Sequence, residues 1–206
     1  MFNELLEGNQ LYHKSILSFL AIPTLSAWGG SSTGSSSFAA TQQAFDDRVA
    51  SAIAMAESYE DAGVTTNMPV SGSATYTGVA VFAESPVIDI SDDVFGVGDV
   101  TMAASFNATG GSISGSISNI LNANDDNGRI DALSGSLAIE SAGFTGNTFS
   151  TTVSGRLTDS EGPVDIAGTM QGAFVGDGGA ASAAFMELTD SDDDFTIYGG
   201  LIAEKD

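Results

Sequence analysis

The sequence predicts an all-β protein, an eight-stranded antiparallel up-and-down barrel preceded by one amphipathic helix. From about residue 68 to residue 206, apolar residues alternate with polar ones, which is typical of half-buried strands. Turn signals rich in Gly, Asn and Asp separate the alternating segments. Glycines also recur within these segments, which suits the tight coiling of a small barrel. Eight consecutive antiparallel strands close naturally into a barrel that leaves no exposed edge.

Eight segments of this region match the strand pattern, and connections of hairpin length join most of them. Gly110-Gly111 and Gly146-Asn147 are two of the turn signals between them. A short piece at residues 87–90 extends the first connection. The expected strands are residues 72–83, 100–108, 111–120, 133–141, 148–158, 164–175, 180–188 and 195–203.

One face of the expected strands is apolar, and the opposite face is rich in hydroxyl groups. Phe149 and Val153 share the apolar face of the segment 148–158, and Val164 begins the apolar face of the segment 164–175. A barrel in an outer membrane needs the reverse arrangement, with an apolar band outside that aromatic girdles frame. We therefore expect the apolar faces to point inward. A packed interior is the default for eight strands, and a hollow interior that holds a ligand is the alternative.

Three further segments precede the expected barrel. Residues 1–27 form a signal-like segment, because Lys14 precedes a short apolar run that ends in small residues; a buried apolar helix is the alternative. Residues 28–40 form a Gly/Ser-rich tether. Residues 41–63 form the amphipathic helix, whose apolar face we expect to pack on the barrel. Binding of a partner through this face is the alternative.

The charge of the chain is strongly negative, with 27 acidic residues against 5 Lys and Arg and a net charge of -22. Such a surface repels phosphate backbones, so nucleic-acid binding is excluded. Docking on anionic lipid is disfavoured for the same reason. Three explanations of the charge remain, namely solubility in salty surroundings, binding of cations and recognition of a basic partner.

Most kinds of catalytic site are excluded by composition. The chain has no cysteine, and its single histidine is His13 in the signal-like segment. Thiol catalysis, disulfides, Ser-His-Asp triads and histidine-based metal centres are therefore not expected in the barrel. We expect no enzymatic activity and no cofactor.

Clustered carboxylates in the expected connections are the remaining candidates for a metal site, because calcium takes oxygen ligands from flexible loops. The sequence around Gly128 resembles part of a calcium-binding EF-hand loop, but Ala123 and Ser134 stand at its first and last ligand positions. A hairpin turn is therefore the expected structure there, and a calcium-binding surface module is an alternative function. The candidate ligands are Asp125, Asp126, Asp190, Asp192, Asp193 and Asp194.

Several pieces of the barrel region carry a resemblance to a known family. They read MPVSGSATYTGVAVF at 68–82, DVTMAASFNATGGSISGSISNI at 99–120, VSGRL at 153–157, IAGTMQGAFVG at 166–176, and AAFMEL followed by IYGGLIAEKD at the C-terminus. In this order they resemble the β-barrel domain of transferrin-binding protein B and its relatives among bacterial surface lipoproteins. The resemblance implies an eight-stranded barrel on the cell surface that binds a protein or a small ligand. It covers one barrel without the family's handle domains, and no binding residue or transferrin specificity carries over.

The end of the signal-like segment also resembles a bacterial lipoprotein signal. Leu25, Ser26 and Ala27 precede the Gly/Ser-rich tether, but Trp28 stands where the lipidated cysteine would be. We expect no lipidation at this position.

These features lead us to expect an exported, cell-surface-type barrel that binds a protein or small ligand through the loops at one end. We expect a monomer at the cell surface, in the outer membrane or outside the cell, and any attachment to a membrane would be through an N-terminal anchor alone. A small outer-membrane barrel or pore is the first alternative function.

Overall fold

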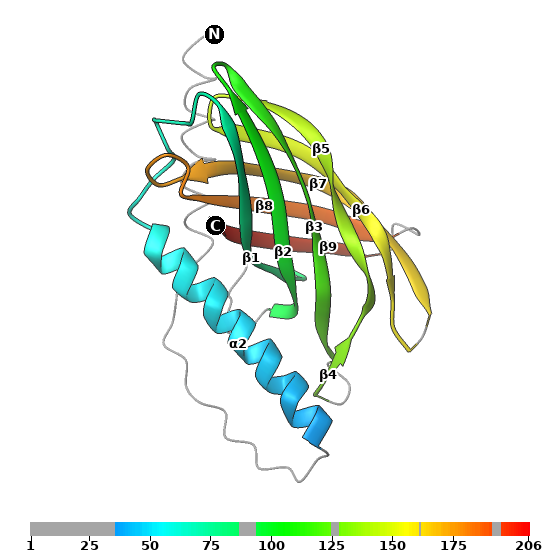
Figure 1. Cartoon of the computed structure of the whole chain (residues 1–206). Helices are drawn as coiled ribbons and strands as arrows, with labels where there is room; N and C mark the ends of the chain where they lie inside the picture. Colours follow the sequence, from blue (N-terminus) through cyan, green and yellow to red (C-terminus); the bar gives the residue numbers. More distant parts are fainter. Residues whose placement is uncertain (1–35, 87–93, 125–127, 161, 191–194) are drawn as a thin grey trace.

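The protein is a closed antiparallel β-barrel with one helix on its outer surface, as a computed structural model shows (Figure 1). The structure describes residues 36–86, 94–124, 128–160, 162–190 and 195–206. This architecture confirms the expected fold class, an eight-stranded barrel preceded by a helix. Its elements are α2 (Ser36–Tyr59), β1 (Gly72–Ala83), β2 (Val94–Asn107), β3 (Gly110–Asn124), β4 (Arg129–Ala132), β5 (Ser134–Thr145), β6 (Thr148–Thr158), β7 (Pro163–Val175), β8 (Ala181–Asp190) and β9 (Thr196–Lys205).

Eight strands follow one another around the barrel, and the first closes on the last. β1 pairs with both β2 and β9, with registers that include Tyr76 opposite Lys205 and Ala83 opposite Tyr198. The short strand β4 lies outside this sequence of eight, because it pairs with β3 alone among the described strands. It follows a turn at Gly128, whose φ of 63° is one that glycine adopts readily.

The strand boundaries agree with the expectation in part. β1 and β6 have the expected bounds, whereas β2 begins six residues early, at Val94, and β3 and β5 each extend four residues further. Irregularities in β2, β3 and β5 interrupt the regular alternation, so these extensions are not visible in the sequence pattern. β4 was not expected, and the piece at 87–90 lies outside the described residues. The helix begins at Ser36, earlier than the expected residue 41. It also ends earlier than the expected residue 63, because a tight turn after Tyr59 leads to Gly63 (φ 64°).

The inward faces of the strands form one apolar core, which confirms the expected orientation. Its densest part is an aromatic cluster around Phe174, whose ring centroid lies 5.1 to 5.8 Å from four other rings. Those rings belong to Tyr76, Phe106, Phe144 and Phe149. The buried hydroxyl of Tyr76 donates a hydrogen bond of 2.9 Å to the carbonyl of Gly179, and burial raises the pKa of Tyr76 to about 12.

One end of the barrel is closed by the chain that links α2 to β1. Within this linker, which we call the strap (residues 60–71), Thr65 donates its backbone N–H to the carbonyl of Phe174 at 2.9 Å. The carbonyl of Thr65 in turn accepts a 2.6 Å bond from the Asn147 side chain. Asn67 bonds to Asp177 and accepts from the N–H of Gly178. We call this the strap end and the opposite end the loop end.

The helix lies along the outside of the barrel, from β4 at the loop end to the strap end (Figure 1). Phe45 and Ala52 of α2 pack on the outward-facing Val79 and Val81 of β1, together with Leu121 of β3. This contact confirms that the apolar face of the helix packs on the barrel. No helix in the described part of the chain is long and apolar enough to cross a membrane.

Glycines within the strands mark places where two strands approach too closely for a side chain. A Cβ atom at Gly168 of β7 would lie 2.0 Å from the carbonyl oxygen of Glu187 in β8. A Cβ atom at Gly78 of β1 would lie equally close to the carbonyl oxygen of Ile202 in β9. By contrast, a Cβ atom at Gly143 of β5 would approach nothing closer than 3.7 Å. The first two glycines therefore set the spacing of neighbouring strands.

We predict that Gly168→Ala lowers the free energy of unfolding by about 2 kcal/mol, because the added methyl group must push β8 away from β7. Gly143→Ala is the matched control and should change the value by less than about 0.5 kcal/mol. Urea denaturation followed by circular dichroism measures both. Equal effects of the two substitutions would contradict this role of Gly168.

Candidate functional site at the loop end

The two ends of the barrel differ in how they are closed. In an antiparallel barrel every second connection lies at the same end, so the links β1–β2, β3–β5, β6–β7 and β8–β9 meet at the loop end. The strap end has a two-residue turn at 108–109 and another at 146–147. Its inward-facing aromatic side chains are buried. The loop end is therefore the candidate for a binding face.

Six apolar side chains with inward register lie at the loop end and remain partly accessible. We call them the mouth ring. Four of them are half-buried against the core, whereas the side chains of Val164 and Phe195 are 39% and 41% exposed. Three large hydrophobic residues are exposed in the described part of the chain, and these are two of them. The ring consists of Phe95, Leu133, Leu157, Val164, Phe195 and Ile197.

Val164 illustrates how the end of a strand differs from its middle. It shares the register of Ile166 and Met170, and it pairs with Leu157 of β6, as the apolar face of this segment predicts. It is nevertheless exposed, because it is only the second residue of β7 and has less of the barrel around it than the buried Ile166. The alternation predicts the face but does not reveal this exposure.

Phe95 and Phe195 meet although their strands are separated by β1. Phe82 pairs with Gly96 and Ala83 pairs with Val94, so Phe95 is the extra residue of a bulge in β2. Bulges re-aim side chains, and here the ring of Phe95 lies with its centroid 6.3 Å from that of Phe195. No sequence signal predicts this pair, since a bulge interrupts the alternation on which strand prediction depends.

Asp190 is the one metal candidate that lies within the described residues. Its carboxylate accepts a 3.3 Å bond from the backbone N–H of Phe195, and its own N–H donates to the carbonyl of Phe195 at 3.4 Å. These bonds join the two ends of the β8–β9 connection. Across the part of the chain that the structure describes, no three His, Asp or Glu residues lie close enough to hold a metal ion. The other candidates, Asp125, Asp126, Asp192, Asp193 and Asp194, lie outside the described residues.

Carboxylates outnumber cations among the described residues of the loop end. Glu84, Asp131, Asp159, Asp165 and Asp190 belong to strand ends and turns of the loop end, where the described cations are Arg129 and Arg156. Arg156 forms a two-pronged ion pair with Asp165, with both N–O distances 2.6 Å. The Arg156 guanidinium lowers the pKa of Asp165, although both side chains are mostly exposed.

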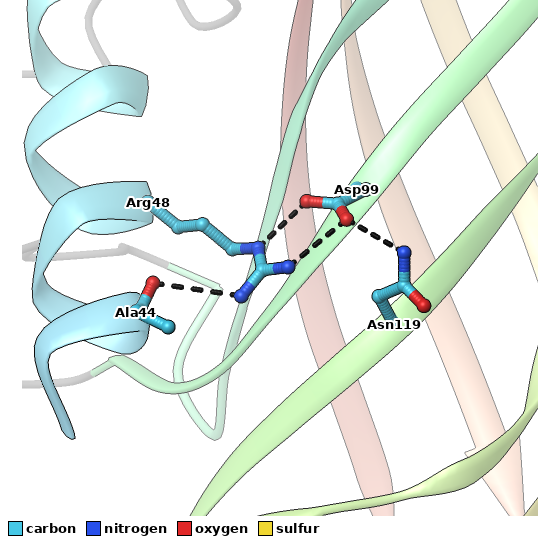
Figure 2. A network of polar contacts seen from close by, with 4 residues as sticks. All are labelled: Ala44, Arg48, Asp99 and Asn119. Atoms are coloured by element: carbon cyan, nitrogen blue, oxygen red, sulfur yellow. Dashed lines mark hydrogen bonds and ion pairs between the residues drawn. The ribbon is translucent and has the colours of Figure 1, made fainter. Parts of the chain in front are cut away.

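A second polar cluster joins the helix to the barrel (Figure 2). Arg48 of α2 donates from Nε and Nη2 to the two oxygens of Asp99 in β2, at 2.6 and 2.9 Å. Asn119 of β3 donates to the same carboxylate at 2.8 Å, and Arg48 also reaches the carbonyl of Ala44 at 3.5 Å. We call this cluster the latch.

The latch sits at a bulge in β3. Val97 pairs with Leu121 and Asp99 pairs with Ser118, so Asn119 and its neighbour form the bulge. Asn119 has a φ of 51°, a left-handed conformation that Asn tolerates better than most residues. The hydrogen bonds from Arg48, and to a smaller extent the bond from Asn119, lower the pKa of Asp99 despite its partial burial. The carboxylate therefore stays ionised and holds the helix by charge-assisted bonds.

No protein-family model and no curated protein matches the chain. The functional proposal therefore rests on the residues of the barrel itself.

We predict that Arg48→Gln lowers the free energy of unfolding by about 1 kcal/mol, because it removes a half-buried ion pair of good geometry. Arg156→Gln is the control, since it breaks a pair of the same geometry that is mostly exposed, and it should have a smaller effect. Urea denaturation near neutral pH compares the two variants. A larger effect of Arg156→Gln would contradict the role of the latch.

The latch also predicts a pH dependence. The pKa of Asp99 is lowered in the folded state, so its contribution is present above the ordinary carboxyl pKa of about 3.9 and is lost as the pH falls through the folded value. The stability difference between the wild type and Asp99→Asn should therefore stay constant from neutral pH downward and shrink in strongly acid solution. Melting temperatures over this range measure it, and a difference that grows with acidity would contradict the assignment.

Proposed function

We propose that this protein is an exported binding protein that engages a protein or small ligand at the loop end of its barrel. The mouth ring is the observation that carries the proposal. Exposed apolar side chains that lie side by side mark interaction sites better than scattered ones do. In the mouth ring Phe95 contacts Phe195, and Leu157 pairs with Val164. At the strap end, by contrast, the inward-facing aromatic rings are buried, and the strap bonds to the backbone of Phe174.

A binding role suits the chemistry of the chain better than a catalytic one. The barrel region contains neither cysteine nor histidine. Asp190 uses its carboxylate to hold the β8–β9 connection together, which favours a structural role over calcium binding for this residue. Outward-facing residues such as Thr101, Ser105 and Thr152 are exposed and polar, which argues against the alternative of a lipid-embedded barrel.

The proposal extends to the family and the location. The pieces of sequence that resemble the transferrin-binding protein B barrel fall within β1, β2, β3, β6, β7, β8 and β9, and the barrel they imply is the fold observed. We propose on this basis that the chain is a single-barrel relative of these surface lipoproteins. Its place would be at the cell surface or outside the cell, as a monomer.

Capture experiments with point variants test the binding proposal. Full-length protein is immobilised and exposed to the medium and surface extract of its native host, alongside Phe195→Ser at the loop end and Val70→Ser at the strap end. Val70 is the matched control because it is a large hydrophobic residue that is 70% exposed. We expect a ligand that the wild type and Val70→Ser retain and Phe195→Ser loses. Retention that depends on Val70 but not on Phe195 would place the binding face elsewhere.

A reporter fusion tests export separately. Residues 1–40 are fused to alkaline phosphatase, which becomes active only outside the cytoplasm, and we expect active enzyme in a bacterial host. Leu20→Arg should abolish the activity, because it interrupts the short apolar run that a signal segment requires. Activity that survives this substitution, or an inactive wild-type fusion, would refute the signal assignment.

A further inference from the structure

We infer that the loop end selects a cationic, amphipathic peptide segment of a partner, with apolar side chains that contact the mouth ring and Lys or Arg side chains that contact the carboxylates of this end. This inference rests on the proposed function and adds the chemical class of the ligand.

The preference for apolar side chains in the ligand comes from the geometry of the mouth ring. Its members come from β2, β6, β7, β9 and the residues next to β5 and β9, so they surround the end of the barrel rather than line one strand. Phe195 and Val164 are the most exposed of them. An inorganic cation would leave these side chains in water, whereas apolar side chains of a peptide would cover them.

The preference for Lys or Arg side chains in the ligand comes from the charge of the loop end. The described carboxylates of the loop end are Glu84, Asp131, Asp159, Asp165 and Asp190, and Arg156 is already paired with Asp165. The chain as a whole carries a net charge of -22. A potential of this sign attracts cationic ligands and repels anionic ones such as fatty acids or nucleic acids.

Charge alone does not distinguish the two ends. Asp177, Glu204 and Asp206 lie at the strap end, but there the inward-facing Phe174 and Phe106 are buried. Among the described residues, partly exposed inward-facing apolar side chains and carboxylates occur together at the loop end. The loop end therefore combines large, partly exposed inward-facing side chains with carboxylates, and it suits a ligand that carries both apolar groups and positive charge.

Fluorescence anisotropy with three labelled peptides of equal length tests the inference on the full-length protein. The probe is a peptide of about 14 residues built from Leu and Lys, and its comparators replace Leu by Ser or Lys by Glu. We expect the Leu/Lys peptide to bind at least about tenfold more tightly than either comparator. Raising the salt from about 50 to about 500 mM should weaken it at least threefold, because screening reduces the attraction.

Point variants then locate the site. Phe195→Ser and Val164→Ser should each weaken binding of the Leu/Lys peptide about fivefold to tenfold, since each removes exposed apolar area from the mouth ring. Val70→Ser should leave it unchanged within about twofold. The two mouth-ring variants are independent, so a folding defect in one, seen as a lowered melting temperature, leaves the other as the test.

The possible failures separate this inference from the proposed function. If the Lys/Ser peptide binds as tightly as the Leu/Lys peptide, binding is charge attraction only and the inference is wrong. If the Leu/Glu peptide binds best and loses affinity in Phe195→Ser, the loop end is a binding face but its cationic specificity is wrong. If the mouth-ring variants alter neither peptide binding nor capture from the native host, both the inference and the proposed function fail.

Discussion

The structure depends above all on the burial of β1 on both of its faces. The inward residues Tyr76 and Phe82 belong to the core of the barrel, while the outward residues Val79, Val81 and Ala83 are covered by α2. A strand of an ordinary up-and-down barrel shows its outer face to water, so this apolar outer face requires a cover. The helix supplies that cover, and the strap and the latch hold the helix in place.

The covering helix explains why the two ends of the barrel differ. The chain leaves α2 at the strap end and must turn there to enter β1, so the residues between them lie over that end. Thr65 and Asn67 bond to the turns between β5 and β6 and between β7 and β8, which joins the strap to the barrel. One end is thus occupied by the protein's own chain, and the opposite end is the one at which we propose that a ligand binds.

The general architecture was predictable from sequence, because alternation reports which residues face a core. The bounds of β1 and β6, the inward face of the strands and the packing of Phe45 and Ala52 on the barrel all follow from periodicity.

The latch was not predictable in this way. Arg48 and Asp99 are 51 positions apart, and Asn119 reaches Asp99 only because a bulge gives it a left-handed backbone. The Phe95–Phe195 pair escaped prediction for the same reason, since the bulge at Phe95 is invisible to a period of two. Side-chain exposure at strand ends, as at Val164, depends on how many strands surround a position, and a single sequence does not contain that information.

The pairing of β1 with β9 has a consequence for how the molecule assembles. The partners Tyr76 and Lys205 are separated by most of the barrel sequence, so the barrel closes only after β9 has been synthesised. Until then both β1 and β8 present unpaired backbone edges, which are prone to pair with other chains. Contacts between residues so distant in sequence also slow folding, because the entropy of closing a long loop must be overcome first. A barrel whose first strand must pair with its last strand cannot close while β9 is still being synthesised, so the preceding strands lack their closed arrangement during that time.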